Sequence, residues 1–466
     1  MTPKRSRTMR RGRRLALSAA GLVALSAAGM ANASTDTTEP TETTAPDDTT
    51  AGTETTGVET TAGAETTAAA ETTASVEGTE GGDAGAAPVD LSGICPETVV
   101  IQTDWFPESE HGWLYEMVGD DPSIDASALT VTGPLVAGGV DTGVDIQIRT
   151  GGPALGTETV SSRLYSDDDI LLGYVYTDEA IQFSDQFPTV AIFSGMEKNP
   201  QMIMWDPATY PDVESIADLG EAGVKIRYFE GAAYMDYFAQ NGILSPDQLD
   251  SSYTGSPEAF VAAEGADAQQ GFGSAEPYIY ENEVDSWSKP VSFQYINDAG
   301  WNNYGESIAT KPENLETYAD CFTALVPILQ QSSVDFVSDP AETIDLILEA
   351  VTAFDTFWVY SPGVAAYGVE TMIGDGLVGN GPNETLGDFD LDRVNGLIEI
   401  AIPVYTSLGQ VPAEGLTAED VVTNEFIDPS IGLPADIGGE PDGSGAPGAS
   451  AAPEDTDTAA DTTTGG

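Results

Sequence analysis

The order of apolar runs that begins near residue 99 sets the strongest limit on what this chain can fold into. Buried-strand patterns lie at 99–101, 144–148 and 170–176, and each is followed by a loop and the start of a helix. Three strand–loop–helix units in succession predict a parallel α/β sheet. Ligands of such sheets bind beyond the carboxyl ends of the strands, which is where these loops lie.

A second α/β unit follows the first. Two apolar strands flank an interruption at 197–200, and another strand is expected at 224–229, before a helix that starts at Gly231. The chain then turns mostly helical, with long helices expected at 315–331, 341–354 and 391–408.

The cysteine count adds a long-range constraint. Cys95 and Cys321 are the only cysteines, and an even pair in an oxidising compartment predicts one disulfide, with two buried free thiols as the alternative. Such a bond would hold the late segment around Cys321 beside the first strand, in one lobe. The α/β unit between them would then be a second lobe, inserted into the first. The expected boundaries are lobe I at 91–200 and 298–437, and lobe II at 201–297.

The N-terminus carries an export signal. Seven basic residues precede an apolar run that starts at Leu15, and Ala31-Asn32-Ala33 supplies a small-x-small cleavage pattern. Residues 1–33 are therefore predicted to be a signal peptide, with an uncleaved anchor as the alternative, and both the Sec and the twin-arginine routes stay open. The protein is expected to be extracytoplasmic: secreted, periplasmic or associated with the cell wall.

Two segments outside the core are predicted to be disordered. Residues 34–90 contain 13 acids, no base, no aromatic residue and neither Leu nor Ile, so they have nothing to bury. This Thr/Glu-rich linker is interpreted as a spacer through a wall or surface layer, or as a solubilising tail. The tail at 438–466 has a similar composition.

The core between them is strongly acidic. It holds eight basic residues against 58 acids, a net charge of about −50. Nucleic-acid binding needs clustered bases that displace counterions, so this composition excludes it. Acidity of this degree fits a salty habitat, where screening shortens charge repulsion.

Five short segments of the core resemble a known family in their order and spacing: 103–107 (TDWFP), 151–153 (GGP), 176–179 (YTDE), 229–232 (FEGA) and 273–278 (GSAEPY). The core resembles the solute-binding proteins of ABC importers, and most of all the group that binds nitrate, sulfonates, taurine and thiamine-pyrimidine precursors. The lipid-attachment cysteine that is common in such relatives is absent.

The resemblance implies an α/β fold of the two-lobed type II periplasmic-binding-protein class, with a ligand cleft at the hinge. It implies a monomer that binds a small molecule without cofactor or chemistry and delivers it to the transmembrane subunits of an ABC permease. The candidate ligand-binding residues follow the expected strands; they are Asp104, Trp105, Phe106, His111, Gly151, Gly152, Thr177, Asp178, Glu230, Gly231, Ala232 and Glu276.

The chemistry of these residues leaves the ligand open. Trp105 and Phe106 suit a flat ligand, and the glycines at two helix starts suit an anion such as a sulfonate or nitrate. The carboxylates instead suit an amine or a pyrimidine.

Enzymatic function has no motif of its own in this sequence. His111 is the only histidine, and neither a G-x-S-x-G nor an H-E-x-x-H pattern is present. No catalytic residue and no metal ligand is therefore predicted. An exported enzyme that acts on a pyrimidine-type precursor and a surface adhesion or cell-wall protein are the alternatives.

Overall fold

The computed structural model describes residues 89–156 and 158–437. The predicted signal peptide at 1–33, all but the end of the linker at 34–90 and the tail at 438–466 lie outside these residues. Within the described part of the chain, no helix is both long and apolar enough to cross a bilayer.

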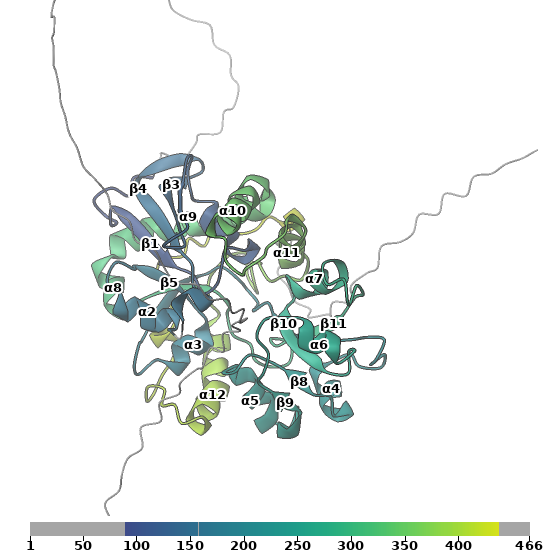
Figure 1. Cartoon of the computed structure of the whole chain (residues 1–466). Coiled ribbons are helices and arrows are strands. Elements are labelled where there is room, and N and C mark those ends of the chain that lie inside the picture. Colours follow the sequence, from purple (N-terminus) through teal and green to yellow (C-terminus); the bar gives the residue numbers. More distant parts are fainter. Residues whose placement is uncertain (1–88, 157, 438–466) are drawn as a thin grey trace, which may run out of the picture. The chain divides into compact units, whose positions relative to one another are not determined.

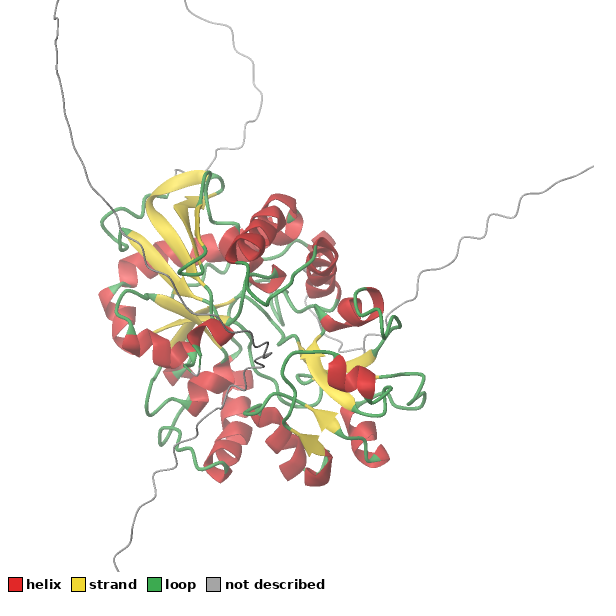
Figure 2. Cartoon of the chain, viewed as in Figure 1, coloured by secondary structure: helices red, strands yellow, loops and turns green. Residues whose placement is uncertain are grey.

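The strands form two separate sheets, which are drawn in yellow in Figure 2. We call the elements around the seven-stranded sheet lobe I and those around the five-stranded sheet lobe II. The lobe I strands, in sheet order, are β2 (Ser123–Asp125), β3 (Thr130–Ala137), β4 (Val140–Arg149), β1 (Thr98–Gln102), β5 (Leu172–Val175), β12 (Ser307–Thr310) and β6 (Val190–Ser194). Those of lobe II are β11 (Ser292–Tyr295), β7 (Gln201–Trp205), β10 (Ala268–Phe272), β8 (Ile226–Arg227) and β9 (Leu249–Asp250).

Helices surround both sheets (Figure 1). Those of lobe I are α1 (Gly112–Tyr115), α2 (Val160–Ser166), α3 (Thr177–Gln182), α8 (Pro312–Thr317), α9 (Ala319–Ser338), α10 (Ala341–Phe354), α11 (Pro362–Gly374) and α12 (Leu391–Ser407). Those of lobe II are α4 (Ile216–Ala222), α5 (Ala233–Gln240), α6 (Glu258–Ala262) and α7 (Glu276–Asn282).

Each sheet contains one antiparallel strand that follows a crossing of the chain between the lobes. In lobe I, β12 pairs antiparallel with β5 and β6, and in lobe II, β7 pairs antiparallel with β10 and β11. Each of these strands is the first one after the chain has crossed from the other lobe, at 195–200 and at 296–306. This exchange confirms the predicted two-lobed α/β fold of the type II periplasmic-binding-protein class.

The prediction of a parallel sheet from the first three units is incomplete. The strands β1, β4 and β5 are parallel, but β2 and β3 extend the sheet as an antiparallel edge. Gly138 and Gly139 join β3 to β4 with φ angles of 55° and 75°, a turn conformation that favours glycine. Helix α11 was also not predicted, although Ser361 caps its start and Pro362 occupies its first position.

Alternate residues of the strands enter two apolar layers. On β7, Met202 and Met204 join one buried cluster, while Ile203 and Trp205 join the other. The first cluster contains residues of α9, α10 and α11, and the second contains residues of α12. Because each cluster includes residues of both sheets, the lobes share their hydrophobic cores.

The predicted disulfide is confirmed. Cys95 precedes β1 and Cys321 is fully buried near the start of α9, and the bond closes a separation of 226 residues. It fixes the returning part of lobe I, drawn green in Figure 1, to its purple first strand.

Arg393, in the first turn of α12, ties the two chain crossings together. Its guanidinium donates to the carboxylate and the carbonyl of Glu197 at 2.8 Å each, and to the carbonyl of Asn303 at 3.1 Å. It also lies 3.7 Å from the ring centre of Tyr304. The helix itself packs against α3 of lobe I and α5 of lobe II. This residue therefore braces the region about which the lobes would hinge.

We expect the disulfide to carry a large part of the stability of the core. Replacing Cys95 and Cys321 by serine should lower the free energy of unfolding by about 2–5 kcal/mol, because the reduced unfolded chain gains loop entropy. Urea unfolding with and without a reducing agent measures this. The double variant is the control, since the reductant should not change it; an equal midpoint for wild type and variant would contradict the expectation.

Loss of the forked guanidinium should weaken the hinge even when the charge is kept. We expect Arg393→Lys to lower the free energy of unfolding by about 1–3 kcal/mol, because several buried carbonyl and carboxylate acceptors lose their donors. The matched control is Arg163→Lys, whose ion pairs are more exposed and should cost less than about 1 kcal/mol. Equal losses in the two variants would argue against the bracing role.

Candidate binding site

The loop that follows β1 is held rigidly at the carboxyl end of the sheet. Gln102 donates from its side-chain amide to the carbonyls of Thr103, Arg149 and Thr150, at 3.0–3.1 Å. Gly151 allows this closeness, because a Cβ there would lie 1.9 Å from the carbonyl oxygen of Thr103. The glycine predicted as part of an anion site thus has a clear packing role.

The predicted aromatic residues of this loop pack against other aromatic rings. The ring centre of Trp105 lies 5.8 Å from that of Trp358, which also stacks on Phe106 at 6.2 Å and on Tyr360 at 5.9 Å. Gly152 lies under Trp105, where a Cβ would approach the indole to 2.4 Å. Trp358 and Tyr360, from the segment between α10 and α11, were not predicted.

Five carboxylates gather where the two lobes meet, and we call them the junction acids. They are Asp104, Glu108, Glu110, Glu276 and Glu306. Asp104 and Glu108 lie on the loop after β1, and Glu110 lies in the short 3-10 helix that follows this loop (Ser109–His111). Glu306 directly precedes β12, and Glu276 is the first residue of α7 in lobe II. Exposed fractions are 4% for Glu110 and 2% for Glu306, whereas the side chains of Asp104 and Glu108 keep 21% and 15%.

Contacts at the junction join the lobes directly. Glu110 accepts a short hydrogen bond from Ser274, which is buried in lobe II. Glu276 accepts from the backbone N–H of Phe272 at 2.7 Å. One carboxylate oxygen of Glu306, Oε2, is buried without a hydrogen-bond partner among the described residues.

Burial and mutual repulsion disfavour the charged forms of these acids. Burial raises the pKa of Glu108 well above its ordinary value, and the charges of Glu110, Glu306, Asp104 and Glu276 raise this pKa further. Burial likewise raises the pKa of Glu306 well above normal, and it raises that of Glu276 to about 7.

The basic residues of the core are engaged elsewhere. The ion pairs of seven of them join carboxylates outside the junction; these bases are Arg149, Arg163, Lys225, Arg227, Lys289, Lys311 and Arg393. The eighth, Lys198, donates to the carbonyl of Asp375 at 3.5 Å. The printed ion pairs of lysine and arginine therefore leave the junction acids without a basic partner of these types, and a site rich in carboxylates conflicts with the anion that the glycines suggested.

His111 lies inside this acidic group. Its ring is fully buried, and Nε2 is 3.2 Å from Oδ1 of Asp104 and 3.8 Å from Oε1 of Glu108. The imidazole also packs against Tyr174, with 5.0 Å between ring centres. One ligand atom from each of Asp104, His111 and Glu306 lies within 4.8 Å of the others.

Thr177 and Asp178 face the second crossing of the chain. The carboxylate of Asp178 accepts from Trp301 Nε1 at 3.0 Å and from Asn303 Nδ2 at 2.8 Å. The hydroxyl of Thr177 accepts from the backbone N–H of Tyr304 at 2.9 Å. Thr177 is the first residue of α3, and Tyr176 occupies the N-cap position of that helix.

The lobe II residues predicted from the resemblance lie at the start of α5. Glu230 and Gly231 are exposed, and Ala232 is partly buried. Within the described ranges, no ion pair or hydrogen bond joins Glu230 to a junction acid. Its part in ligand binding stays a prediction.

Glu306 and Ser274 are members of the site that the sequence did not indicate. Glu306 has a φ of 46°, a left-handed conformation that is uncommon outside glycine. The only available signal was an acidic residue directly before a buried strand, which is weak in a chain with 77 acids.

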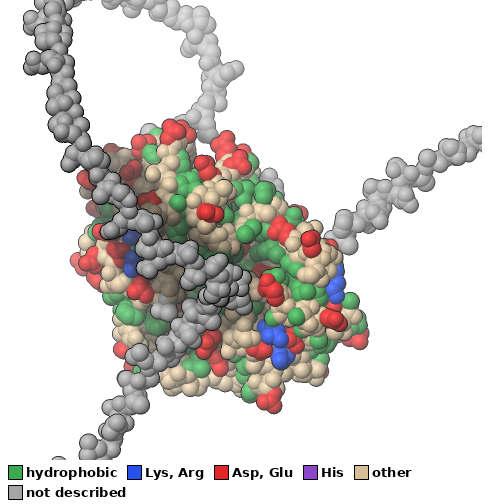
Figure 3. All heavy atoms as spheres, viewed as in Figure 1, with side chains coloured by type: hydrophobic (Ala, Val, Ile, Leu, Met, Phe, Trp, Pro, Cys, Tyr) green, Lys and Arg blue, Asp and Glu red, His purple; other side chains and the backbone are tan. Residues whose placement is uncertain are grey.

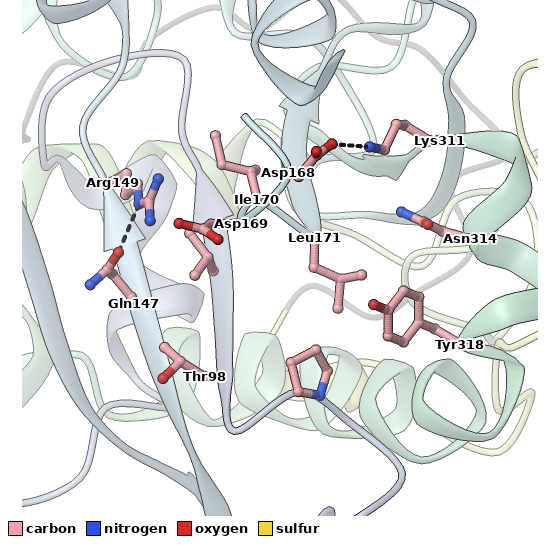
Figure 4. A pocket seen from close by; sticks show the side chains of 12 residues that line it. Thr98, Gln147, Arg149, Asp168, Asp169, Ile170, Leu171, Lys311, Asn314 and Tyr318 are labelled. Carbon is pink, nitrogen blue, oxygen red and sulfur yellow. Dashed lines mark hydrogen bonds and ion pairs between the residues drawn. The ribbon is translucent and has the colours of Figure 1, made fainter. Parts of the chain in front are cut away.

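A pocket lies elsewhere, on lobe I, beside β1, β4 and the segment that precedes β5 (Figure 4). Its basic groups already have partners: Lys311 lies 3.5 Å from Asp168, and Arg149 lies 3.1 Å from Asp167. None of the predicted ligand-binding residues is part of its lining.

Comparison with known proteins finds likeness of structure alone. No protein-family model and no curated protein sequence matches the chain. The ligand-binding component of an ABC-type import system from Staphylococcus aureus, solved with zinc bound, is 12% identical, with a TM-score of 0.44 over 71% of this chain and 100% of that one. The periplasmic aliphatic sulphonate-binding protein of Escherichia coli is 14% identical, with a TM-score of 0.45 over 69% and 90%.

A third solved structure, the periplasmic nitrate-binding protein of Synechocystis PCC 6803, is 12% identical, with a TM-score of 0.44 over 71% of this chain and 87% of that one. Identities this low concern the fold only. Any inference about the function of this chain therefore rests on its own residues.

The stability of the protein should fall as pH rises through neutrality. Burial raises the pKa of Glu179 and of Glu276 to about 7, above the ordinary value of 4.5, so the folded state holds protons that the unfolded state has lost. The resulting stabilisation is complete below about pH 4.5 and is lost as pH rises through 7. Thermal unfolding from pH 5 to 8 with a chelator measures this slope. Glu179→Gln should flatten it, and an unchanged slope in that variant would contradict the assignment.

Proposed function

We propose that this chain is an extracytoplasmic solute-binding protein of an ABC importer, which captures a small cationic or amino-bearing organic molecule between its lobes. The observation that carries the proposal is the set of junction acids, contributed by both lobes. The export signal at 1–33, the lobe division at 200/201 and 297/298, a monomeric state and delivery to a permease belong to the same proposal.

The sign of the ligand charge follows from electrostatics. Carboxylates that are buried without a basic partner cost free energy, and they either take up protons or attract a cation. A protonated amine or an aminopyrimidine supplies positive charge and N–H donors, whereas a sulfonate or nitrate adds a further negative charge. The junction therefore favours the amine-like class of ligand over the anionic class.

Closure of the lobes supplies the means of capture. Lobe I already reaches lobe II through Glu110 and Ser274, and Tyr295 of lobe II donates to Asp375 at 2.7 Å. A ligand that neutralises acids of both lobes stabilises the closed state more than the open one, and this difference shifts the population. A permease would then distinguish the loaded protein by its closed form.

The same residues favour binding without chemistry. The only histidine is enclosed by carboxylates, and both cysteines are used in the disulfide, so neither thiol is a free nucleophile. An exported enzyme on this fold stays the alternative. It would be recognised by conversion of a ligand that co-purifies with the protein.

Calorimetry with the full chain and chelator tests the proposal. We expect one binding event for compounds from a panel of amines and aminopyrimidines and none for sulfonates or nitrate. Glu276→Gln should weaken that binding at least tenfold, about 1.4 kcal/mol, because it removes the lobe II carboxylate. Glu349→Gln is the matched control, since Glu349 is an exposed acid on α10.

Small-angle scattering should show compaction on binding the same compound. Tight binding of a sulfonate or nitrate would overturn the assigned ligand class. A panel without any binder, together with an unchanged radius of gyration, would overturn the transport function. An unchanged affinity in Glu276→Gln would mean that the ligand does not reach lobe II at this point.

A further inference from the structure

We propose that Asp104, His111 and Glu306 form a binding site for a divalent transition-metal ion. The inference goes beyond the proposed function, because it concerns a metal ion and not an organic solute. It also departs from the sequence, in which no metal-binding motif is visible.

The geometry of the three residues carries the proposal. One ligand atom of each lies within 4.8 Å of the other two. Ligands that share one metal ion sit about 2.0–2.2 Å from it, so neighbouring donor atoms are about 3–4 Å apart. The 3.2 Å between His111 Nε2 and Asp104 Oδ1 already falls in that range. A shift of the Glu306 side chain toward these two atoms would complete the set.

A second observation also favours a cation beside Glu306. Glu306 is 2% exposed, and its Oε2 has no hydrogen-bond partner in the described part of the chain. A buried oxygen of a carboxylate without a donor is costly, and native proteins rarely leave one in that state. The backbone of Glu306, with a φ of 46°, is also strained for a residue other than glycine, so the surrounding structure must hold it in this conformation. A bound cation would satisfy this oxygen.

The donor types select the metal. One imidazole nitrogen and two carboxylate oxygens suit Zn²⁺, Mn²⁺, Fe²⁺ or Co²⁺. Soft ions such as Cu⁺ need thiolate or thioether ligands, and Cys95 and Cys321 are bonded to each other. Mg²⁺ and Ca²⁺ prefer oxygen ligands only, so the buried imidazole argues against them.

The surroundings support an exchangeable site. Oε1 of Glu108 lies 3.8 Å from His111 Nε2 and is close enough to join as a further ligand after a small movement. The side chain of Asp104 keeps 21% of its surface exposed, which gives an ion a route from solvent. Nε2 is the ring nitrogen that faces Asp104 and Glu108, so it is the atom that would serve as the metal ligand.

Metal binding would link two segments that the fold brings together. Asp104 lies on the loop after β1 and His111 ends the 3-10 helix that follows it, while Glu306 ends the second crossing between the lobes. An ion shared by these segments would fix the end of the second crossing to the rigid loop after β1.

Calorimetric titration of the full, chelator-treated chain with Zn²⁺ tests the site, with Mg²⁺ in millimolar excess to occupy weak surface carboxylates. We expect one zinc ion per chain. Glu306→Gln and His111→Gln should each weaken binding by at least tenfold, and Glu349→Gln should bind as the wild type does. Co²⁺ titration adds an optical readout, since visible absorption bands report nitrogen and oxygen coordination.

Glu306→Gln also guards against a failure to fold. It removes an unpartnered carboxylate, so its metal-free form should unfold at or above the wild-type temperature, and its loss of zinc cannot then be ascribed to misfolding. Equal zinc binding in wild type and Glu306→Gln, or competition by Mg²⁺ at similar concentration, would overturn the proposal. Because the organic ligand is sought with chelator present, failure of either test leaves the other independent.

Discussion

The double crossing of the chain between its two sheets is the constraint on which the rest of the structure depends. Strand β7 follows the first crossing and joins the sheet of lobe II, and β12 follows the second crossing and joins the sheet of lobe I. Each sheet therefore contains a strand that the chain can supply only after it has crossed between the lobes. The crossings are braced by Arg393, and the disulfide fixes the returning chain to its first strand. The chain thereby joins the lobes through two short connections, and Glu306 of the junction lies at the end of the second one.

Charge at this junction differs in kind from charge on the surface. Acids scattered over the visible face in Figure 3 are solvated, and salt screens them. Glu110 and Glu306 are almost fully buried, so repulsion between them is not screened in the same way. The surface acidity therefore bears on solubility, while the junction acids are the basis of the proposed ligand binding. The proposed organic cation and the proposed metal ion would each supply the positive charge that the buried carboxylates lack.

The rigid loop after β1 fixes the positions of the side chains that would contact a ligand. Gly151 and Gly152 let backbone and indole approach the loop closely, and the amide of Gln102 fixes its start. Aromatic packing by Trp358 covers the same loop. The side chains of Asp104 and His111 are thus held in place before any ligand arrives, which reduces the entropy that binding costs.

The sequence by itself determined the α/β class, the two lobes and the disulfide, because strand periodicity and a single pair of cysteines are local or countable signals. It also placed Asp104 and His111 on a loop at the carboxyl end of a strand. Only the tertiary structure decided that Glu306 joins them, since a distant acid among so many carries no periodic signal. The same holds for Asp178, whose carboxylate binds Trp301 and Asn303 at the hinge. Which distant side chains meet at the junction depends on how the two crossings orient the lobes. This orientation is set by tertiary packing and not by local sequence.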